Sequence, residues 1–429
     1  MLRSMFAGVS GLRTHQVMMD VVGNNIANVN TIGYKSSNAI FSDLLSQTLR
    51  GAGAPADELN GGTNPAQIGL GVRLAAITTN FSQGASQLTG RSTDFAIQGD
   101  GTFIVDAGGT RSYTRAGSFN LDGLGQLVTQ EGGLVQGWNG VNGVVDTNQS
   151  IGALRIPVGQ SIAPVTTTEI GIGGNLPADV AIGTMLNASI NAYNTLGTAI
   201  PIRVQYTKVA DGATTVDWQV DVFDPDGNQI SGPYVMQFDQ STSELVAPAT
   251  RQLNIPQIDL DTILVNGVSP AGDWDAAGLI LDFGDAADPD RLTGAASTNS
   301  IAALNQNGSP LGPFVSFSVS QEGLISGVFS NGKNQQLGQI ALAAFTNPAG
   351  LEKAGGSLLR STVNSGEPII GVAGTGGRGT MSGGTVEMSN VDLAAEFTNL
   401  IVAQRGFQAN SRIITASDEI LQDLVNLKR

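Results

Sequence analysis

Two glycine-rich stretches of the 429-residue chain have the spacing of phosphate-binding loops. Residues 327–334, GVFSNGKN, place a lysine as a P-loop does, but Asn334 replaces the Ser or Thr that coordinates magnesium. Residues 374–379, GTGGRG, match a dinucleotide-binding fingerprint. Neither precedes a helical pattern whose N-terminus could hold a phosphate, and Asn331-Gly332 is a strong hairpin signal. We therefore expect a hairpin at the first stretch and a flexible linker at the second.

Two acidic segments raise the question of cation binding. The stretch Asp224–Asn228, DPDGN, is similar to a calcium loop, but its glycine comes two positions early and the closing glutamate is missing. The carboxylates Asp282, Asp285, Asp288 and Asp290 lie in loop-like sequence rather than in a defined cleft. A β-turn and a solvated acidic loop are the simpler interpretations, and no acidic pair is placed for general acid-base catalysis.

Thiol and imidazole chemistry are almost absent from this chain. It has no cysteine, and His15 is its single histidine. Disulfides, thiolate metal sites, the usual zinc sites and Ser-His or Cys-His catalytic pairs are therefore excluded. The sequence predicts a protein that is not an enzyme and has no metal or cofactor, with His15 on a helix surface.

The net charge of −15 is concentrated in the middle of the chain. Residues 160–299 hold 17 acidic and 4 basic residues, a balance of −13. Such a surface opposes nucleic-acid binding, which requires clustered Lys and Arg. The opening MLRSMFAGVSGLRTHQ lacks the apolar core of a secretory signal, and no run is long enough to span a membrane. Taken alone, these features predict a cytoplasmic protein without membrane insertion.

Both ends of the chain have the periodicity of amphipathic helices. Near the N-terminus the positions that step by three and four are Leu2, Met5, Val9, Leu12, Gln16, Met19, Gly23 and Ile26, mostly apolar. Near the C-terminus they are Leu393, Phe397, Leu400, Gln404, Phe407, Ser411, Ile414, Asp418, Leu421 and Val425. A second apolar row, Ile413, Ile420, Leu424 and Leu427, widens the C-terminal face. Faces this wide must be covered, and the pattern allows either pairing within the chain or packing between copies.

The boundaries of these helices carry their own signals. Ser389 and Asp392 fit a capping box, and we expect a helix from Val391 to Leu427, about 55 Å long. The N-terminal helix runs into Gly23–Ser36, GNNIANVNTIGYKS, where four asparagines fall within seven residues. Asparagine is a poor helix former, so a helix end and a turn are expected near Asn30 and Gly33.

Between the helical ends the sequence is glycine-rich and typical of short strands and turns. Alternation is clear at Val216, Trp218, Val220 and Val222. We predict an α+β fold in which nested all-β domains are inserted into a terminal α-helical coiled-coil layer. The predicted boundaries are 1–30 and 391–429 for the helical assembly domain, 31–70 and 364–390 for a connector, 71–159 and 303–363 for an inner β-domain, and 160–302 for an inserted outer β-domain.

Four stretches carry a resemblance to a known family. They are GVSGLRTHQVMMDVVGNNIANVNTIGYKS, residues 8–36, VEMSNVDLAAEFTNLIVAQRGFQANSRIITASDEILQDLVNLKR, residues 386–429, and the internal GLGVRLAAITTNFSQGASQLTGRSTDFAIQGDGTFIV and LGQIALAAFTNPAGLEKAGGSL. Together they cover about a third of the chain, in the order and spacing of the bacterial flagellar rod and hook axial proteins, which the chain resembles. Its length and its large insert are similar to those of hook members.

The resemblance implies a structural subunit of the flagellar hook, a curved helical tube that transmits torque from rod to filament as a universal joint. It implies self-polymerisation, contacts with the distal rod, the hook cap and the hook-filament junction proteins, and passage through the flagellar type III export apparatus. The expected location is then extracellular, without a cleaved signal peptide. A distal rod protein and, from another class, a β-rich surface adhesin are the alternatives.

We expect the assembly to depend on two groups of residues. The predicted assembly interface comprises Leu2, Met5, Val9, Leu12, Met19, Asn24, Asn25, Ile26, Asn28, Asn30, Leu393, Phe397, Leu400, Gln404, Arg405, Phe407, Ile414 and Leu421. The predicted flexible connectors depend on Gly33, Gly69, Gly71, Gly374, Gly376 and Gly379.

Overall fold

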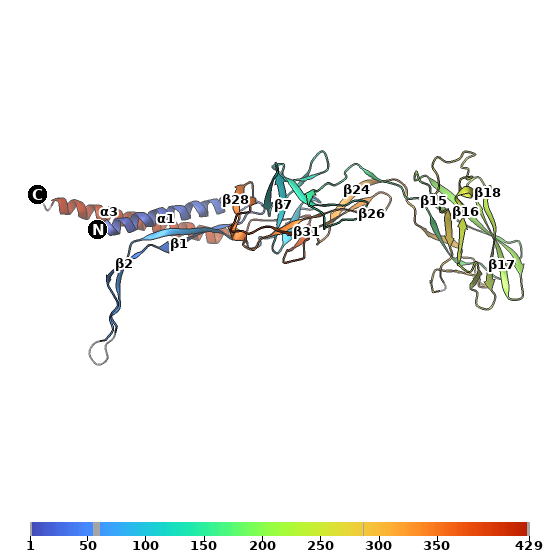
Figure 1. Ribbon diagram of the computed structural model, residues 1–429, viewed down its shortest axis with the longest axis horizontal. Coiled ribbons are helices and arrows are strands. Elements are labelled where there is room, and N and C mark those ends of the chain that lie inside the picture. The colour runs from blue at the N-terminus through green and yellow to red at the C-terminus, as the bar shows by residue number, and fades with distance from the viewer. Residues whose placement is uncertain (1, 55–60, 286, 427–429) are drawn as a thin grey trace. The chain divides into compact units, whose positions relative to one another are not determined.

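The computed structural model describes residues 2–54, 61–285 and 287–426 of the chain. It is mostly β-structure, with a long helix at each end (Figure 1). The chain folds into two compact units. Unit 1 comprises Met1–Pro157, Phe317–Gly327 and Gln335–Arg429, and unit 2 comprises Val158–Ser316 and Val328–Asn334.

The two terminal helices of unit 1, α1 (Leu2–Ala27) and α3 (Leu393–Asn426), pack against each other (Figure 1). They run antiparallel, because Asn25 of α1 bonds Glu396 near the start of α3, whereas Gly11 lies against Asn410 further along it. In both pairs the residue numbers add up to 421, which fixes the register of the helix pair. The structure thus pairs the two apolar faces within one chain.

Asp392 caps α3. Its Oδ1 accepts hydrogen bonds from the backbone N–H groups of Ala394 and Ala395, at 2.8 and 3.2 Å. The sequence predicts a start at Val391 with Ser389 as the cap, so the observed start is two residues later. Both residue types suit the position, and only the local backbone path decides which carboxylate or hydroxyl reaches the free N–H groups.

A β-ribbon follows α1 in the range that the sequence predicts as a connector. Its first part pairs β1 (Ser37–Asp43) with β4 (Val72–Thr79) and packs along α1. Its second part pairs β2 (Ser46–Arg50) with β3 (Ala66–Gly69). The range 31–70 therefore contains three paired strands, because backbone hydrogen bonding between distant segments overrides a weak local signal.

A large sheet forms the main β-structure of unit 1. The order of its strands there is β26 (Asn334–Ile340), β11 (Leu134–Asn139), β7 (Thr102–Ala107), β8 (Thr110–Thr114), β29 (Leu358–Arg360) and β28 (Glu352–Gly355). Smaller strands flank this path: β9 (Asn120–Leu121), β10 (Leu127–Val128), β12 (Gly152–Ala153), β27 (Leu342–Ala344) and β30 (Ile369–Gly371). A 3-10 turn, η1 (Pro348–Gly350), precedes β28. One core of the sheet is formed around Ile104, Tyr113 and Trp138.

Two short strand pairs join the N-terminal and C-terminal segments of unit 1. The strand β6 (Phe95–Gln98) pairs with β31 (Thr380–Gly383), and β5 (Ser86–Leu88) pairs with β32 (Thr385–Glu387). Residues 99–101 connect β6 to β7, and these two strands pair with other partners rather than with each other. Residues 374–379, predicted as a flexible linker, form hydrogen-bonded turns instead.

Unit 2 contains two five-stranded sheets. The first has the order β15 (Met185–Tyr193), β16 (Ala199–Asp211), β17 (Thr215–Phe223), β18 (Gln229–Asp239) and β19 (Leu245–Ala247). The second is formed by β20 (Gln252–Ile255), β21 (Leu279–Asp282), β14 (Glu169–Asn175), β22 (Leu292–Thr293) and β23 (Ala302–Gln306). Unit 2 also holds the short helix α2 (Gln257–Leu260) and β13 (Ser161–Ile162), which pairs with β24 (Gly312–Val319).

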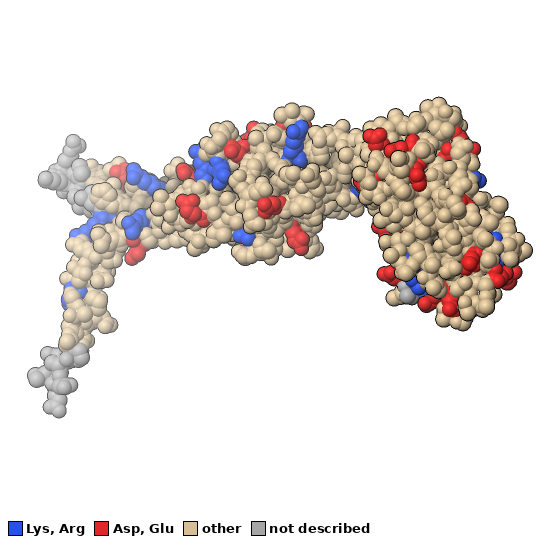
Figure 2. Space-filling model, turned by 45° about the vertical axis from the view of Figure 1, so that its right-hand side comes forward, with Lys and Arg blue, Asp and Glu red and all other residues tan. Residues whose placement is uncertain are grey.

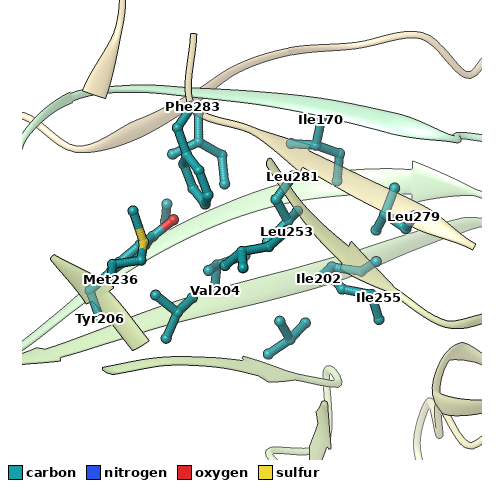
Figure 3. Packing of buried hydrophobic residues seen from close by; sticks show 14 of the residues in the cluster. Ile170, Ile202, Val204, Tyr206, Met236, Leu253, Ile255, Leu279, Leu281 and Phe283 are labelled. Atoms are coloured by element: carbon teal, nitrogen blue, oxygen red, sulfur yellow. The ribbon is translucent and has the colours of Figure 1, made fainter. Parts of the chain in front are cut away.

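The core of unit 2 is formed by residues from both sheets (Figure 3). The alternation predicted at Val216, Trp218, Val220 and Val222 is confirmed, because all four side chains are buried. The stretch 224–228 is a turn between β17 and β18, and residues 330–333 form the predicted hairpin turn between β25 (Leu324–Phe329) and β26. On the face drawn in Figure 2, acidic side chains are spread over unit 2 rather than gathered in one patch.

Candidate assembly surface

Part of the predicted assembly interface is already used inside the chain. On α3, Leu400, Phe407, Ile414 and Leu421 are half-buried, and Ala403 between them is fully buried. These positions face α1, since a Cβ placed at Gly8 would lie 3.3 Å from Ile414 Cγ1. A heptad-spaced row therefore covers the chain's own first helix, as spacing by three and four residues permits.

A second set of apolar side chains, on both sides of the buried stripe, is left exposed on the same helices. It consists of residues that the α1–α3 contact does not cover, and their exposed fractions are 40% for Leu393, 50% for Phe397, 51% for Ile401, 54% for Val402, 44% for Ile413 and 52% for Ile420. On α1, Phe6 is 70% exposed and Val9 39% exposed. Runs of exposed large apolar side chains of this kind mark surfaces that bind a partner. We call this set of residues on α1 and α3 the exposed apolar face.

The remaining predicted interface residues of the helices fall into three groups. Met5, Leu12, Met19 and Ile26 of α1 are half-buried. Gln404 and Arg405 of α3 are exposed. The side chain of Leu2 lies outside the described residues.

The asparagine cluster at the end of α1 serves mainly local bonds. Asn28 Nδ2 donates to the backbone carbonyl and to Oδ1 of Asn24, at 2.9 and 2.7 Å. Its Oδ1 accepts from the hydroxyl of Thr31 at 3.0 Å, which closes the turn after the helix. Asn24 and Asn30 are exposed. The hydrogen bonds of Asn28 therefore help to end the helix.

Asn25 is different, because it is buried and joins three elements of unit 1. Its Nδ2 donates to Glu396 Oε1 and to the carbonyl of Ser37, both at 2.8 Å. Its Oδ1 accepts from the N–H of Ser37 at 3.0 Å and from the hydroxyl of Tyr34 at 3.2 Å. Burial raises the pKa of Tyr34, and the negative charge of Glu396 adds to that rise. Asn25 thus satisfies four polar groups of its own chain, of which the carboxylate of Glu396 is buried.

A buried ion cluster that the sequence analysis missed lies beside this network. Glu387 is fully buried, and its Oε1 accepts from Lys35 Nζ at 2.7 Å and from the N–H of Gly84 at 2.8 Å. Its Oε2 lies 3.2 Å from Arg115 Nη1. Burial lowers the pKa of Lys35, and the bond to Glu387 partly offsets that effect. No single-sequence signal links residues 352 positions apart, although each belongs to a segment that carried the family resemblance.

The predicted connector glycines lie in ordered positions. Gly33 is buried at a φ of 68°, and its N–H donates to the carbonyl of Glu387 at 2.8 Å. Gly71, at a φ of 120°, lies between the ribbon and Ser10 of α1, and Gly69 ends β3. The other three, Gly374, Gly376 and Gly379, belong to the turns before β31. Hinge motion at these glycines stays a prediction.

Neither a metal site nor a membrane-spanning helix is found in the described residues. Among residues 2–54, 61–285 and 287–426, no group of three or more His, Asp or Glu side chains is placed to hold a metal ion. Within the same ranges, no helix is long and apolar enough to cross a membrane.

Comparison with protein families places three segments of the chain. Residues 5–35 match the model described as flagella basal body rod protein. Residues 96–176 match the flagellar hook protein FlgE/F/G D1 domain, and residues 382–427 match the flagellar basal body rod FlgEFG protein C-terminal model.

Full-length relatives extend this result. The chain is 39% identical to the flagellar hook protein FlgE of Borreliella burgdorferi and 36% identical to that of Treponema pallidum, with 100% of each chain covered. It is 33% identical, again over 100% of both chains, to the flagellar basal-body rod protein FlgG of Bacillus subtilis. A crystal structure of Helicobacter pylori flagellar hook protein FlgE2 aligns with 16% identity and a TM-score of 0.48, covering 69% of this chain and 98% of that one.

This chain belongs to the family of flagellar hook and basal-body rod proteins. The family is structural, and the full-length matches to hook proteins support the role of a hook subunit.

Proposed function

We propose that copies of this chain polymerise into the tube of a bacterial flagellar hook, and that the exposed apolar face of α1 and α3 forms contacts between copies. The exposed face supports this proposal, because α1 and α3 cover each other and still leave Leu393, Phe397 and Ile401 in solvent. Full burial of such a side chain contributes about 1.5–3 kcal/mol, so covering the half that is still exposed contributes about 1 kcal/mol each. Several of them on one helix favour a lasting contact between copies.

In this proposal the tube works as a universal joint that transmits torque from rod to filament. Each row of subunits lengthens and shortens as the curved tube rotates, so contacts outside the helical layer must be able to slide. The glycines of the predicted connectors supply the tilt, and unit 2 takes part in the sliding contacts. Its surface suits sliding contacts, because exposed ion pairs are individually weak.

Assembly into a flagellar hook implies further partners for this chain. We propose that the chain leaves the cell through the flagellar type III export apparatus without a cleaved signal peptide. Outside the cell it meets the distal rod, the hook cap and the hook-filament junction proteins.

A distal rod protein is the second candidate function. The full-length match to a basal-body rod protein, at 33% identity, favours keeping it. The two candidates differ in one property, since a rod subunit forms a straight, rigid tube and a hook subunit forms a curved one.

Electron microscopy of the purified full chain under assembling conditions tests whether the chain polymerises and whether the resulting tube is curved. Curved tubes are expected, straight tubes would favour the rod protein, and monomers alone would contradict the proposal. Phe397→Ser should abolish or strongly reduce tubes while the monomer keeps its circular dichroism spectrum. The matched control is Leu196→Ser in unit 2, where Leu196 is 61% exposed and outside the proposed contact. Equal tube formation by both variants would remove the exposed apolar face from the proposal.

A further inference from the structure

An apolar groove of about 420 Å³ lies between α1 and the β-ribbon of unit 1. Helical spacing brings Phe6, Val9 and Val17 to its α1 wall, and Leu44, Leu70 and Leu74 line its ribbon wall. Phe6, Val9, Leu70 and Leu74 each leave more than a third of their surface in solvent. The groove therefore presents apolar surface that its own chain does not cover.

Positive charge accompanies this apolar surface. Arg13 and Arg73 both line the groove, and no carboxylate does. Within the described residues neither arginine has an ion-pair partner, although Arg73 Nε donates to Ser42 Oγ at 3.1 Å. A fitting occupant would be a segment with an apolar stripe flanked by carboxylates.

The end of α3 has this complementary pattern. Ile413 and Ile420 are seven residues apart, so they share one face of the helix, and both are exposed. Glu419 and Asp423 flank that face, and both are exposed without an ion-pair partner in the described parts of the chain.

The register of the helix pair shows that Ile420 cannot reach Val9 of its own chain. Residue numbers of facing positions add up to 421, so Val9 is level with residue 412. Ile420 lies eight residues further along α3, which is about 12 Å at 1.5 Å per residue. The end of α3 also runs past the start of α1, and it is there that another copy can reach it.

We infer that the groove between α1 and the β-ribbon receives the end of α3, residues 413–423, from a second copy of this chain. The inference rests on the proposed function, since it assumes that copies assemble. Ile420 lies on the apolar walls, and Arg13 and Arg73 pair with Glu419 and Asp423. Each copy offers one groove and one helix end on different parts of its surface, so the contact is head-to-tail and continues from copy to copy.

The absence of cysteine makes a direct test possible. In the double variant Val9→Cys/Ile420→Cys, mild oxidation of the assembled full chain should give a ladder of covalent dimers, trimers and longer species. Cysteines about 12 Å apart along one helix pair cannot bond within a chain, because a disulfide needs Cα atoms within about 7 Å. Either single variant can give dimers at most. Tubes of the double variant that run only as monomers after oxidation would overturn the inference.

Charge reversal gives a second, independent test. Arg13→Glu/Arg73→Glu should raise the protein concentration needed for assembly about tenfold or more, which corresponds to 1.4 kcal/mol. Adding Glu419→Arg/Asp423→Arg should restore assembly. Arg111→Glu/Arg360→Glu, the matched control outside the groove, should leave it unchanged. Unchanged assembly in the groove variant, or no rescue by the added pair, would contradict the inference. A wild-type chain that never assembles would instead contradict the proposed function.

Discussion

The side-chain amide of Asn25 donates a hydrogen bond of 2.8 Å to the carboxylate of Glu396, 371 positions later in the chain. Both residues are buried, and Glu396 Oε2 has no hydrogen-bond partner in the described residues. This bond joins the end of the first helix to the start of the last one. It therefore sets the register in which α1 and α3 present their exposed apolar face.

Asn25→Ala should destabilise the helix pair by about 1–3 kcal/mol, because the buried carboxylate of Glu396 then loses its only donor from α1. Denaturant unfolding followed by the helical circular dichroism signal measures this, since the two long helices both belong to unit 1. Asn30→Ala, which changes an exposed asparagine, is the matched control. Similar losses of unfolding free energy in the two variants would show that the bond from Asn25 to Glu396 does not stabilise the helix pair.

Glu387→Gln should destabilise unit 1 by about 3–5 kcal/mol, because it removes the negative charge between two buried cations, Lys35 and Arg115. Glu352→Gln, at an exposed carboxylate of β28, should change the free energy of unfolding by less than about 0.5 kcal/mol. Denaturant unfolding of the two variants checks the difference. A small effect at residue 387 would mean that the cluster contributes little to stability.

The lowered pKa of Lys35 predicts a dependence on pH. Between that lowered pKa and the ordinary value of 10.5, the unfolded chain binds more protons than the folded one. The free energy of unfolding contributed by this group should therefore rise with pH through that window. Comparing the full chain with Lys35→Met across alkaline pH isolates the contribution, and parallel pH profiles would contradict the prediction.

Gly33→Ala should destabilise unit 1 by about 1–3 kcal/mol or more, because alanine is strained at a φ of 68°. Its Cβ would also meet the backbone of Arg115 and Ala116, which cannot move aside as a flexible side chain could. Gly51→Ala is the matched control, since a Cβ there meets nothing within 4 Å. Thermal unfolding of both variants tests whether this turn is as rigid as its geometry indicates.

Several features could be predicted from the sequence because they depend on neighbours a few positions apart. The periodicity of the two ends indicated long helices, and the structure places them at Leu2–Ala27 and Leu393–Asn426. Alternation around Trp218 indicated a strand with one buried face. The Asn331-Gly332 pair indicated a hairpin, which β25 and β26 form.

Other features depend on contacts between distant segments and were not predicted. The pairing of β6 with β31 brings together residues more than 280 positions apart, and it makes part of the predicted connector 364–390 a paired strand. Asn25 was assigned to contacts between copies, yet its amide bonds Glu396, Ser37 and Tyr34 within the chain. The cluster around Glu387 had no local signal, because ion pairing depends on distance in space.

The sequence by itself determined that both ends are amphipathic helices with more apolar surface than one helix pair can cover, since that surface follows from residue type and helical spacing alone. Only the tertiary structure decided which row of each helix is used inside the chain. Packing at Gly8, Gly11 and Ala403 sets a single register for α1 against α3. That register covers Leu400, Phe407 and Ile414 and leaves Leu393, Phe397 and Ile420 in solvent, because two helices in close contact bury only the facing stripe of each.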